Sequence, residues 1–182
     1  MRVLRSWLLL VVLLIPAGAH ASDHNASLFV APSYLLAQGT TSHLGGWHVS
    51  GEVTVKKPIK LSFVGDLSTH FFGSDGGRDL TQITFMVGPR WTLLSGRKGM
   101  PFVHAMALGA VQRSEGRRQV ATTAGAFAVG AGLDFVPAAR GKNGFRVQGD
   151  YIQPVATTPT ADLKGSLRIS VGWIYRFHDP HP

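Results

Sequence analysis

The stretch Leu167–Phe177, LRISVGWIYRF, decides how the rest of this sequence is interpreted. A large apolar side chain stands at every second position: Leu167, Ile169, Val171, Trp173, Tyr175 and Phe177. A period of two residues predicts a β-strand, because successive side chains of a strand point to opposite faces of the sheet. Strands of water-soluble proteins seldom carry so long an apolar row on one face. We therefore expect this face to contact something other than water.

Seven earlier segments have the same alternating character and complete the pattern. They cover residues 27–37, 47–55, 59–71, 81–91, 102–111, 125–135 and 145–152. Helical periodicity is nearly absent. Segments of about ten residues, separated by turn residues, are typical of transmembrane β-barrels, whereas strands of water-soluble sandwiches usually have about five or six. The sequence predicts an all-β fold, an eight-stranded antiparallel up-and-down transmembrane β-barrel.

The composition bounds the class of protein further. The chain has 182 residues, enough for one domain, and no cysteine, which excludes disulfides, thiol catalysis and cysteine-based metal sites. Charged residues make up only 15%, while 45% of residues are hydrophobic, an unusual balance for a water-soluble domain. The formal net charge is +8, but no lysine or arginine block and no aromatic platform resembles a nucleic-acid site. We expect no nucleic-acid partner.

The N-terminal residues have the organisation of a secretory signal peptide. Arg2 and Arg5 precede an apolar core over residues 7–15, and AHA at 19–21 fits a cleavage site. An uncleaved membrane anchor is the alternative. After residue 21 no apolar stretch reaches the roughly 18 residues that a membrane-spanning helix needs. An exported chain without a spanning helix is free in the periplasm, secreted, or a barrel in an outer membrane, and the alternating strands favour the barrel. The expected organisation is a signal peptide over 1–21, a barrel over 22–177 and a tail over 178–182.

Aromatic residues fall near the ends of the expected strands. We assume that both ends of the barrel chain are periplasmic, which divides the aromatics into a periplasmic and an outer set. Two girdles of aromatic residues, one at each membrane–water interface with an aliphatic band between them, are typical of transmembrane barrels. The expected interface aromatics are Tyr34, Trp47, Phe71, Trp91, Phe135, Phe145, Tyr151, Tyr175 and Phe177, and Phe29 and Phe102 fall near periplasmic strand ends as well.

The inward positions of the alternation carry charges of both signs. They are Glu52, Asp66, Asp134 and Asp150 against Arg90, Arg146, Arg168 and Arg176. Side chains just fill the interior of an eight-stranded barrel, and an unpaired buried charge is costly. We expect these residues to pair across the lumen as an ionic plug. A polar channel that opens when pairs break is the alternative.

The segment 102–111 fits two phases. One turns Phe102, Met106 and Leu108 outward and places His104 toward lipid near the interface; we favour it because it exposes large apolar residues. The opposite phase places His104 in the lumen and exposes only small residues. Pro89 cannot donate a hydrogen bond to a neighbouring strand. We therefore expect a bulge or a strand end there.

Catalytic and metal-binding patterns are weak. His48, Ser50 and Glu52 share one strand face, as residues of a lipid-modifying barrel enzyme would. However, residues i and i+2 of a strand are about 7 Å apart, and this face is expected to point into the lumen rather than toward lipid. We therefore interpret the three as ordinary lumen residues. No metal-binding spacing or cofactor motif is present, so we expect no catalytic residue, metal or cofactor.

Charge placement differs between the two sets of connections. The periplasmic set carries Lys56, Lys57, Lys60, Arg97, Lys98, Arg140 and Lys142 with no acid beside them. Such cations favour contact with anionic phospholipid headgroups. The outer connections are nearly balanced, and RSEGRRQ at 113–119 could contact lipopolysaccharide phosphates. Outer-membrane lipids, and lipopolysaccharide as a candidate, are thus the expected partners.

The order and spacing of these segments resemble a known family. The motifs that carry the resemblance are GWHVSGEVTVKKPIKLSFVGDLSTHF (46–71), FMVGPRW (85–91), PFVHAMALG (101–109), VGAGLDF (129–135), FRVQGDYI (145–152) and the closing LRISVGWIYRF. They are similar to small barrels of the OmpA-like/OmpW-like superfamily, which implies the outer membrane of a Gram-negative bacterium. The resemblance implies a monomeric or weakly associating barrel, without the enzyme activity that most members of the family also lack. It also implies assembly by machinery that reads a terminal aromatic residue; here HDPHP follows Phe177. The resemblance favours a structural or surface-interaction role. The alternatives are a passive porin-like channel for small or hydrophobic solutes and, third, a lipid-modifying enzyme.

Overall fold

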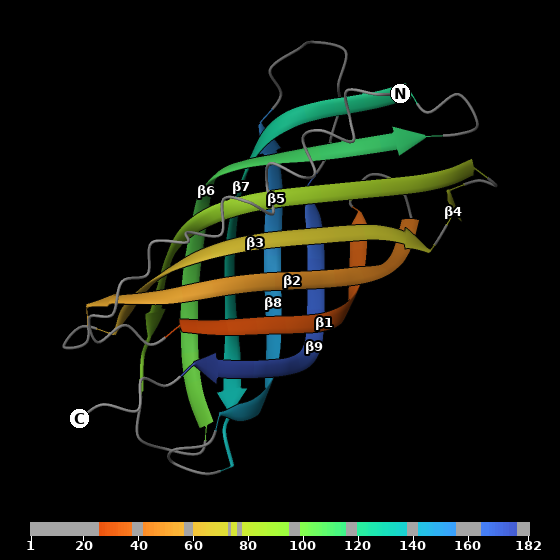
Figure 1. The fold of residues 1–182 in the computed structure, drawn as a ribbon. Coiled ribbons are helices and arrows are strands. Elements are labelled where there is room, and N and C mark those ends of the chain that lie inside the picture. Colours follow the sequence, from red (N-terminus) through yellow and green to blue (C-terminus); the bar gives the residue numbers. More distant parts are fainter. Residues whose placement is uncertain are drawn as a thin grey trace.

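The computed structural model describes nine strands, shown in Figure 1. They are β1 (Ala26–Ala37), β2 (Ser42–Lys56), β3 (Leu61–Phe72), β4 (Ser74–Asp75), β5 (Arg78–Thr92), β6 (Gly99–Glu115), β7 (Val120–Phe135), β8 (Asn143–Val155) and β9 (Ser166–Phe177). The described residues are 26–37, 42–56, 60–72, 74–75, 78–94, 99–115, 120–137, 142–155 and 165–177. The expected signal peptide and the tail lie outside them. No helix among the described residues is long and apolar enough to cross a membrane.

Antiparallel pairing closes the sheet on itself. The pairing order runs β3, β2, β1, β9, β8, β7, β6, β5, and β5 pairs with β3 to complete the circle. The closing segment of the sequence, β9, pairs with β1 on one side and β8 on the other. The two-residue β4 pairs with β5. The predicted eight-stranded antiparallel barrel is confirmed.

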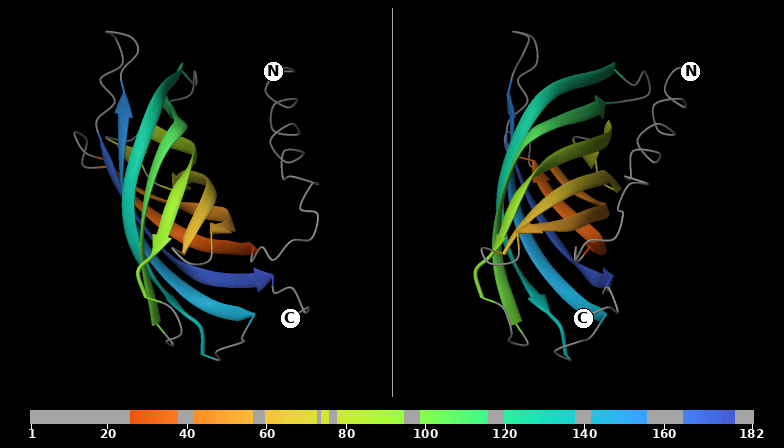
Figure 2. Two further views of the ribbon diagram at one scale, coloured as in Figure 1. Left: turned by 90° about the vertical axis from the view of Figure 1, so that its left-hand side faces the viewer. Right: turned by 60° about the vertical axis from the view of Figure 1, so that its left-hand side comes forward.

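The two ends of the barrel differ in what they carry. At the turn end, β1 begins, β9 ends, and the connections 57–60, 93–98 and 136–142 join neighbouring strands. At the opposite loop end, β5, β6 and β7 extend beyond their neighbours: β6 pairs with β7 as far as Glu115 and Val120, while β8 joins β7 only from Gly125 onward. Figure 2 shows the tilted strands and this taller part of the wall.

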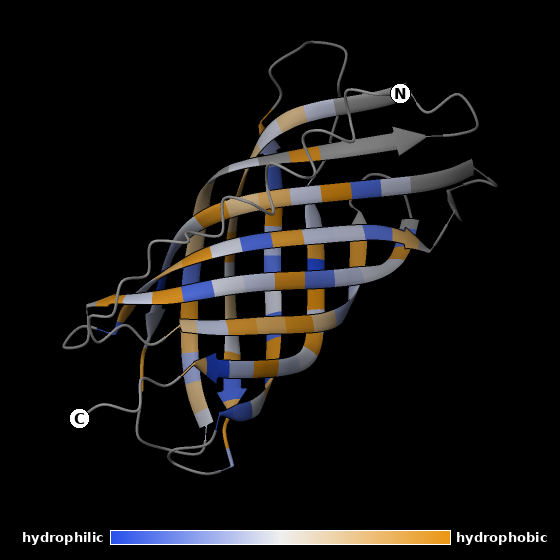
Figure 3. Ribbon diagram, viewed as in Figure 1, coloured by the Kyte–Doolittle hydropathy of each residue, from blue (hydrophilic) through white to orange (hydrophobic). Residues whose placement is uncertain are grey.

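Alternation along each strand separates two chemical environments. In β9, Leu167, Ile169 and Val171 are exposed on the outside, whereas Arg168 and Ser170 are buried in the lumen. The other long strands repeat this pattern, which Figure 3 shows as alternating hydrophobic and hydrophilic bands. A water-soluble barrel would bury its large apolar side chains inside. The outer surface here is instead suited to lipid.

The favoured phase of strand 102–111 is wrong. Phe102, Met106 and His104 of β6 are all buried in the lumen, and Val103 is exposed outside; the side chain of Leu108 is not among the described ones. Phe29, expected near the periplasmic interface, is also fully buried. Lipid does not require bulky side chains at every position, so a small-residue outer face is tolerated, whereas the lumen must be filled.

Pro89 lies where the pairing of β5 with β6 is irregular. The register shifts between Val87 and Arg90, and a second shift on the other side of β6 falls between Met106 and Gly109. A bulge accommodates the missing amide donor of proline without leaving a regular ladder position unpaired. The expected irregularity at Pro89 is therefore present inside the strand rather than at its end.

Replacing Leu67 by lysine tests whether the outer surface faces lipid. Leu67 is exposed on β3, midway between Phe63 and Phe71. A lysine at the bilayer midplane destabilises a folded barrel by roughly 2–4 kcal/mol, whereas one near an interface costs about 0–1 kcal/mol. We expect Leu67→Lys to show the larger loss and Val55→Lys, near the turn end of β2, the smaller one. Denaturant unfolding in lipid vesicles measures both; equal losses would contradict a lipid-facing surface.

Candidate functional site

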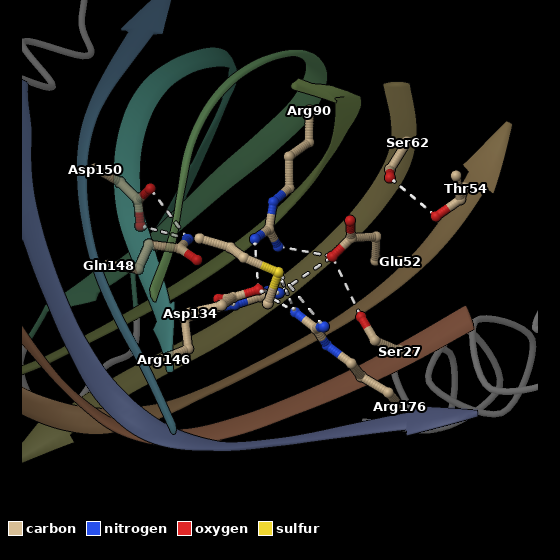
Figure 4. A network of polar contacts seen from close by, with 11 residues as sticks. Ser27, Glu52, Thr54, Ser62, Arg90, Asp134, Arg146, Gln148, Asp150 and Arg176 are labelled. Atoms are coloured by element: carbon tan, nitrogen blue, oxygen red, sulfur yellow. Dashed lines mark hydrogen bonds and ion pairs between the residues drawn. The ribbon is translucent and has the colours of Figure 1, made fainter. Parts of the chain in front are cut away.

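The lumen nearest the turn end holds five charged side chains, which we term the turn-end layer: Glu52, Arg90, Asp134, Arg146 and Arg176. Arg90 donates to Glu52 at 2.7 Å and to Asp134 at 2.9 Å. Arg146 donates to Asp134 at 2.7 Å and to Glu52 at 3.1 Å. Figure 4 shows these contacts converging from several strands. Each carboxylate is therefore shared by more than one arginine.

Arg176 is the outermost member of the turn-end layer. Its guanidinium reaches Asp134 at 3.3 Å and the sulfur of Met100 at 3.7 and 3.8 Å. The side chain of Arg176 is 30% exposed, whereas those of Arg90 and Arg146 are 2% and 1% exposed. Arg176 thus stands at the border between the ionic layer and the turn-end mouth.

A second group of charges, the central layer, comprises His48, Asp66, His104, Asp150 and Arg168. Arg168 is fully buried and donates to both oxygens of Asp66, at 2.8 and 2.9 Å, and to Asp150 at 2.8 Å. A planar guanidinium suits this double pairing, because its donors lie in a fixed fork. One arginine from β9 therefore joins acids on β3 and β8.

A histidine completes each arm of the central layer. Nε2 of His48 lies 2.5 Å from Asp66, and Nδ1 lies 3.0 Å from the hydroxyl of Ser170. On the other side, Nε2 of His104 lies 2.7 Å from Asp150. The result is a continuous chain, His48–Asp66–Arg168–Asp150–His104, that crosses the lumen and connects five strands.

Two aromatic rings lie between the ionic layers. Phe102 contacts Arg90 of the turn-end layer, 3.4 Å from its ring centroid, and stacks with the ring of His104 of the central layer. Phe29 lies 5.1 Å from Arg146 and meets the ring of His48 edge-on. A guanidinium over an aromatic face is an attractive contact that strengthens when water is excluded. This explains why both aromatics turn inward rather than toward the interface.

Glycines on the inner face of β7 make room for these side chains. A Cβ at Gly130 would lie 2.2 Å from the carboxylate of Asp150 and 2.4 Å from Nε2 of His104. A Cβ at Gly132 would lie 2.3 Å from the ring of Phe102. The register places His104 and Asp150 on either side of Gly130. Their contact therefore passes over a residue without a side chain.

Toward the loop end apolar side chains enter the lumen beside buried polar ones. A cluster of buried residues, the apolar layer, consists of Leu35, Leu44, Met86, Met106, Val111, Ala126, Ala128 and Ile152. Beside it, Ser33 hydrogen-bonds to His70, while the hydroxyls of Ser50 and Thr84 have no protein partner among the described residues. From the turn end outward the lumen thus contains a charged layer, aromatic rings, a second charged layer, and then apolar side chains mixed with polar ones.

The comparisons with known proteins give similarity of fold. No protein-family model matches the chain, and no curated protein matches it in sequence. The structure of Neisserial surface protein A superposes with a TM-score of 0.68 over 87% of this chain and 99% of that one, at 13% identity. OprG from Pseudomonas aeruginosa gives 0.60 over 88% and 99%, at 8% identity. Ail, the attachment invasion locus protein of Yersinia pestis, solved with the heparin analogue sucrose octasulfate, gives 0.56 over 85% and 97%, at 15% identity.

The fold is that of a small outer-membrane β-barrel. Such barrels carry girdles of aromatic residues at both interfaces, and the structure places every expected interface aromatic on the outer surface. Seven are exposed and two, Tyr151 and Tyr175, are partly exposed. At the turn end, Tyr175 lies between Trp173 and Phe177 along β9, with ring centroids 5.7 and 4.9 Å away. Their assignment to membrane interfaces remains a prediction from this position.

The structure brings together all eight charged residues that the sequence places in the lumen. Their exact partners were not predicted from the sequence, nor were the contacts that His48 and His104 make with Asp66 and Asp150. His48 was expected to face the lumen, and it is buried there. The signal was present for His48, because it shares the inward face of β2 with Glu52. His104 was missed because the phase of its strand was wrong. In a barrel of this kind, lumen residues are identified by the two-residue alternation: they lie an even number of positions from an inward-facing residue of the same strand.

His48, Ser50 and Glu52 do not act on one another. His48 binds Asp66 and Ser170, Glu52 binds arginines and Ser27, and Ser50 has no partner among the described residues. Ser170, His48 and Asp66 do form a serine–histidine–acid series. Its members are buried in the lumen, and Asp66 is held by Arg168. The described residues contain no cluster of three or more potential metal ligands.

Replacing Gly130 by alanine tests the central layer. The added methyl group would collide with Asp150 and His104 and force their contact apart. Overpacking of this kind lowers the free energy of unfolding by roughly 1–3 kcal/mol. The matched control is Gly149→Ala on β8, where a Cβ would meet nothing within 4 Å. We expect no loss for the control; equal stability of both variants in vesicles would refute the packing at Gly130.

Proposed function

We propose that this chain is an integral protein of a Gram-negative outer membrane, exported by a cleaved signal peptide, with a structural or surface-interaction role and no enzymatic activity. The observation that carries the proposal is the pairing of all eight inward charges: four arginines and four carboxylates meet in the lumen. A lumen filled in this way favours a closed barrel over a conducting one. The outer surface and the loop end are then the parts of the barrel that can interact with other molecules.

The energetics of the lumen support closure. Removing one partner of a buried ion pair costs roughly 3–5 kcal/mol, because the remaining charge is left without compensation. Each layer shares its carboxylates among several donors, so no single pair can open alone. The apolar layer fills lumen space beyond the central layer, beside buried polar side chains such as Ser68 and Ser166. Passive transport would have to displace both the ionic layers and the apolar layer.

The loop end is the surface available for interaction. There β5, β6 and β7 continue beyond their neighbours with polar sequence, QRSE at 112–115 and TT at 122–123. We propose that this taller wall and the connection that follows it meet lipopolysaccharide or another surface partner. Outer-membrane lipids surround the barrel, the barrel-assembly machinery inserts it, and the chain is a monomer. The attachment protein Ail shares the fold, which is compatible with a surface role.

Conductance measurements distinguish the closed barrel from the passive channel. We expect purified wild-type protein in planar bilayers to show no discrete openings. Arg168→Ser leaves Asp66 and Asp150 buried without their shared cation, so water should enter the lumen and the leak current should rise. The slower gel migration of heated samples verifies that both proteins fold. Stable unitary openings of the wild type would support the passive channel instead.

Export and enzyme activity have separate tests. N-terminal sequencing of the outer-membrane protein is expected to begin at Ser22, because cleavage follows AHA at 19–21. An intact Met1 in that fraction would contradict a cleaved signal.

Mass spectrometry of lipid A is expected to show the same acylation with wild type, with Ser50→Ala and without the protein. A change in acylation that requires Ser50 would establish the lipid-modifying alternative.

A further inference from the structure

The charges of the turn-end layer do not cancel. Three arginines share two carboxylates, Glu52 and Asp134. Asp134 already accepts from Arg146 at 2.7 Å and from Arg90 at 2.9 Å, while its contact to Arg176 is longer, at 3.3 Å. Arg176 is also the exposed member of the group. The surplus positive charge therefore lies at the turn-end mouth.

A second cation stands directly beside Arg176. The backbone amide of Arg176 donates to the carbonyl of Lys142 at 2.7 Å, and the neighbouring pairs Asn143–Tyr175 and Gly144–Ile174 continue that register. Residue 142 immediately precedes β8, and the register continued by one residue places it opposite Arg176. Lys142 is exposed and has no acidic partner among the described residues.

Like charges directly opposite on neighbouring strands repel each other. The repulsion is relieved if an anion lies between them. A guanidinium carries more N–H donors than Asp134 and Met100 take up, so Arg176 keeps donors for a phosphate oxygen, and lysine adds a point charge. We propose that Arg176 and Lys142 form a binding site for a phosphate group at the turn-end mouth of the barrel.

The phosphate has two possible sources. The aromatic residues Trp173, Tyr175 and Phe145 lie on the outer surface at the same end of β9 and β8. Side chains of this kind mark the depth of lipid headgroups, so a phospholipid could supply the phosphate from the side of the barrel. Free inorganic phosphate could enter from the mouth. Both present the same chemistry to Arg176 and Lys142.

Calorimetric titration with inorganic phosphate tests the site. The protein is folded in octyl glucoside, which contains no phosphate, at low ionic strength. We expect millimolar binding that weakens about fivefold in Lys142→Gln, as loss of one partly exposed ion pair predicts, and that is retained in Lys142→Arg. Arg176 is left intact because it also belongs to the turn-end layer. Heated and unheated gel samples verify folding of each variant.

Two control variants separate a site from general attraction. Lys60 precedes β3, which lies diametrically opposite β8 in the barrel, and is partly exposed at the same end. Arg113 lies on β6 near the loop end. We expect Lys60→Gln and Arg113→Gln to change phosphate affinity less than twofold. Absence of binding in octyl glucoside, or equal losses in all three glutamine variants, would overturn the proposal.

Phospholipid vesicles identify the source. If binding of inorganic phosphate persists after the protein is inserted into vesicles of phosphatidylcholine and phosphatidylglycerol, the site takes free phosphate. If it is seen only in octyl glucoside, and Lys142→Gln alone lowers stability in the vesicles, a lipid headgroup fills the site. Either result supports a phosphate site. Neither result depends on whether the lumen conducts ions, so the phosphate site and the closed barrel can be refuted separately.

Discussion

Pairing of charge inside a closed sheet is the constraint on which the rest of this structure depends. Because the barrel has no free edge, each strand must present one face to lipid and the other to a narrow interior. An arginine on the inner face can remain ionised only if acids on other strands reach it. Arg168 meets this condition with Asp66 and Asp150, residues far apart in sequence. Closing the sheet and neutralising its interior are thus a single requirement.

The aromatic rings show how this requirement shapes the packing. Two ionic layers in direct contact would bring arginines of both layers close together. Phe29 and Phe102 separate them and still offer a favourable face to the nearest cations. The rings contact histidines on their other side. Each ring therefore serves as filler, spacer and electrostatic partner, and none of these roles is evident from its hydrophobicity alone.

The sequence was sufficient for the features that depend on local periodicity. The number of strands, their antiparallel order and the lumen side of Glu52, Asp134 and Arg146 all follow from a two-residue alternation. The phase of β6 does not follow from this alternation. Phe102, His104 and Met106 alternate with Val103, Ala105 and Ala107, and either set can face lipid. The choice depends on Arg90, Asp150 and the glycines of β7. Those contacts are set by register between strands, which no single segment encodes.

The inner face of β7 has a consequence for the shape of the lumen. From Ala124 to Gly132 it carries only alanine and glycine, and Asp134 is its first larger side chain. Side chains of β6 and β8, namely Phe102, His104 and Asp150, therefore lie directly against the inner face of β7, where a Cβ would otherwise stand. Volume added on β7 must be removed from another strand. Conversely, shortening the side chains that lean on β7 would open a passage along this one strand, without widening the barrel or changing its number of strands.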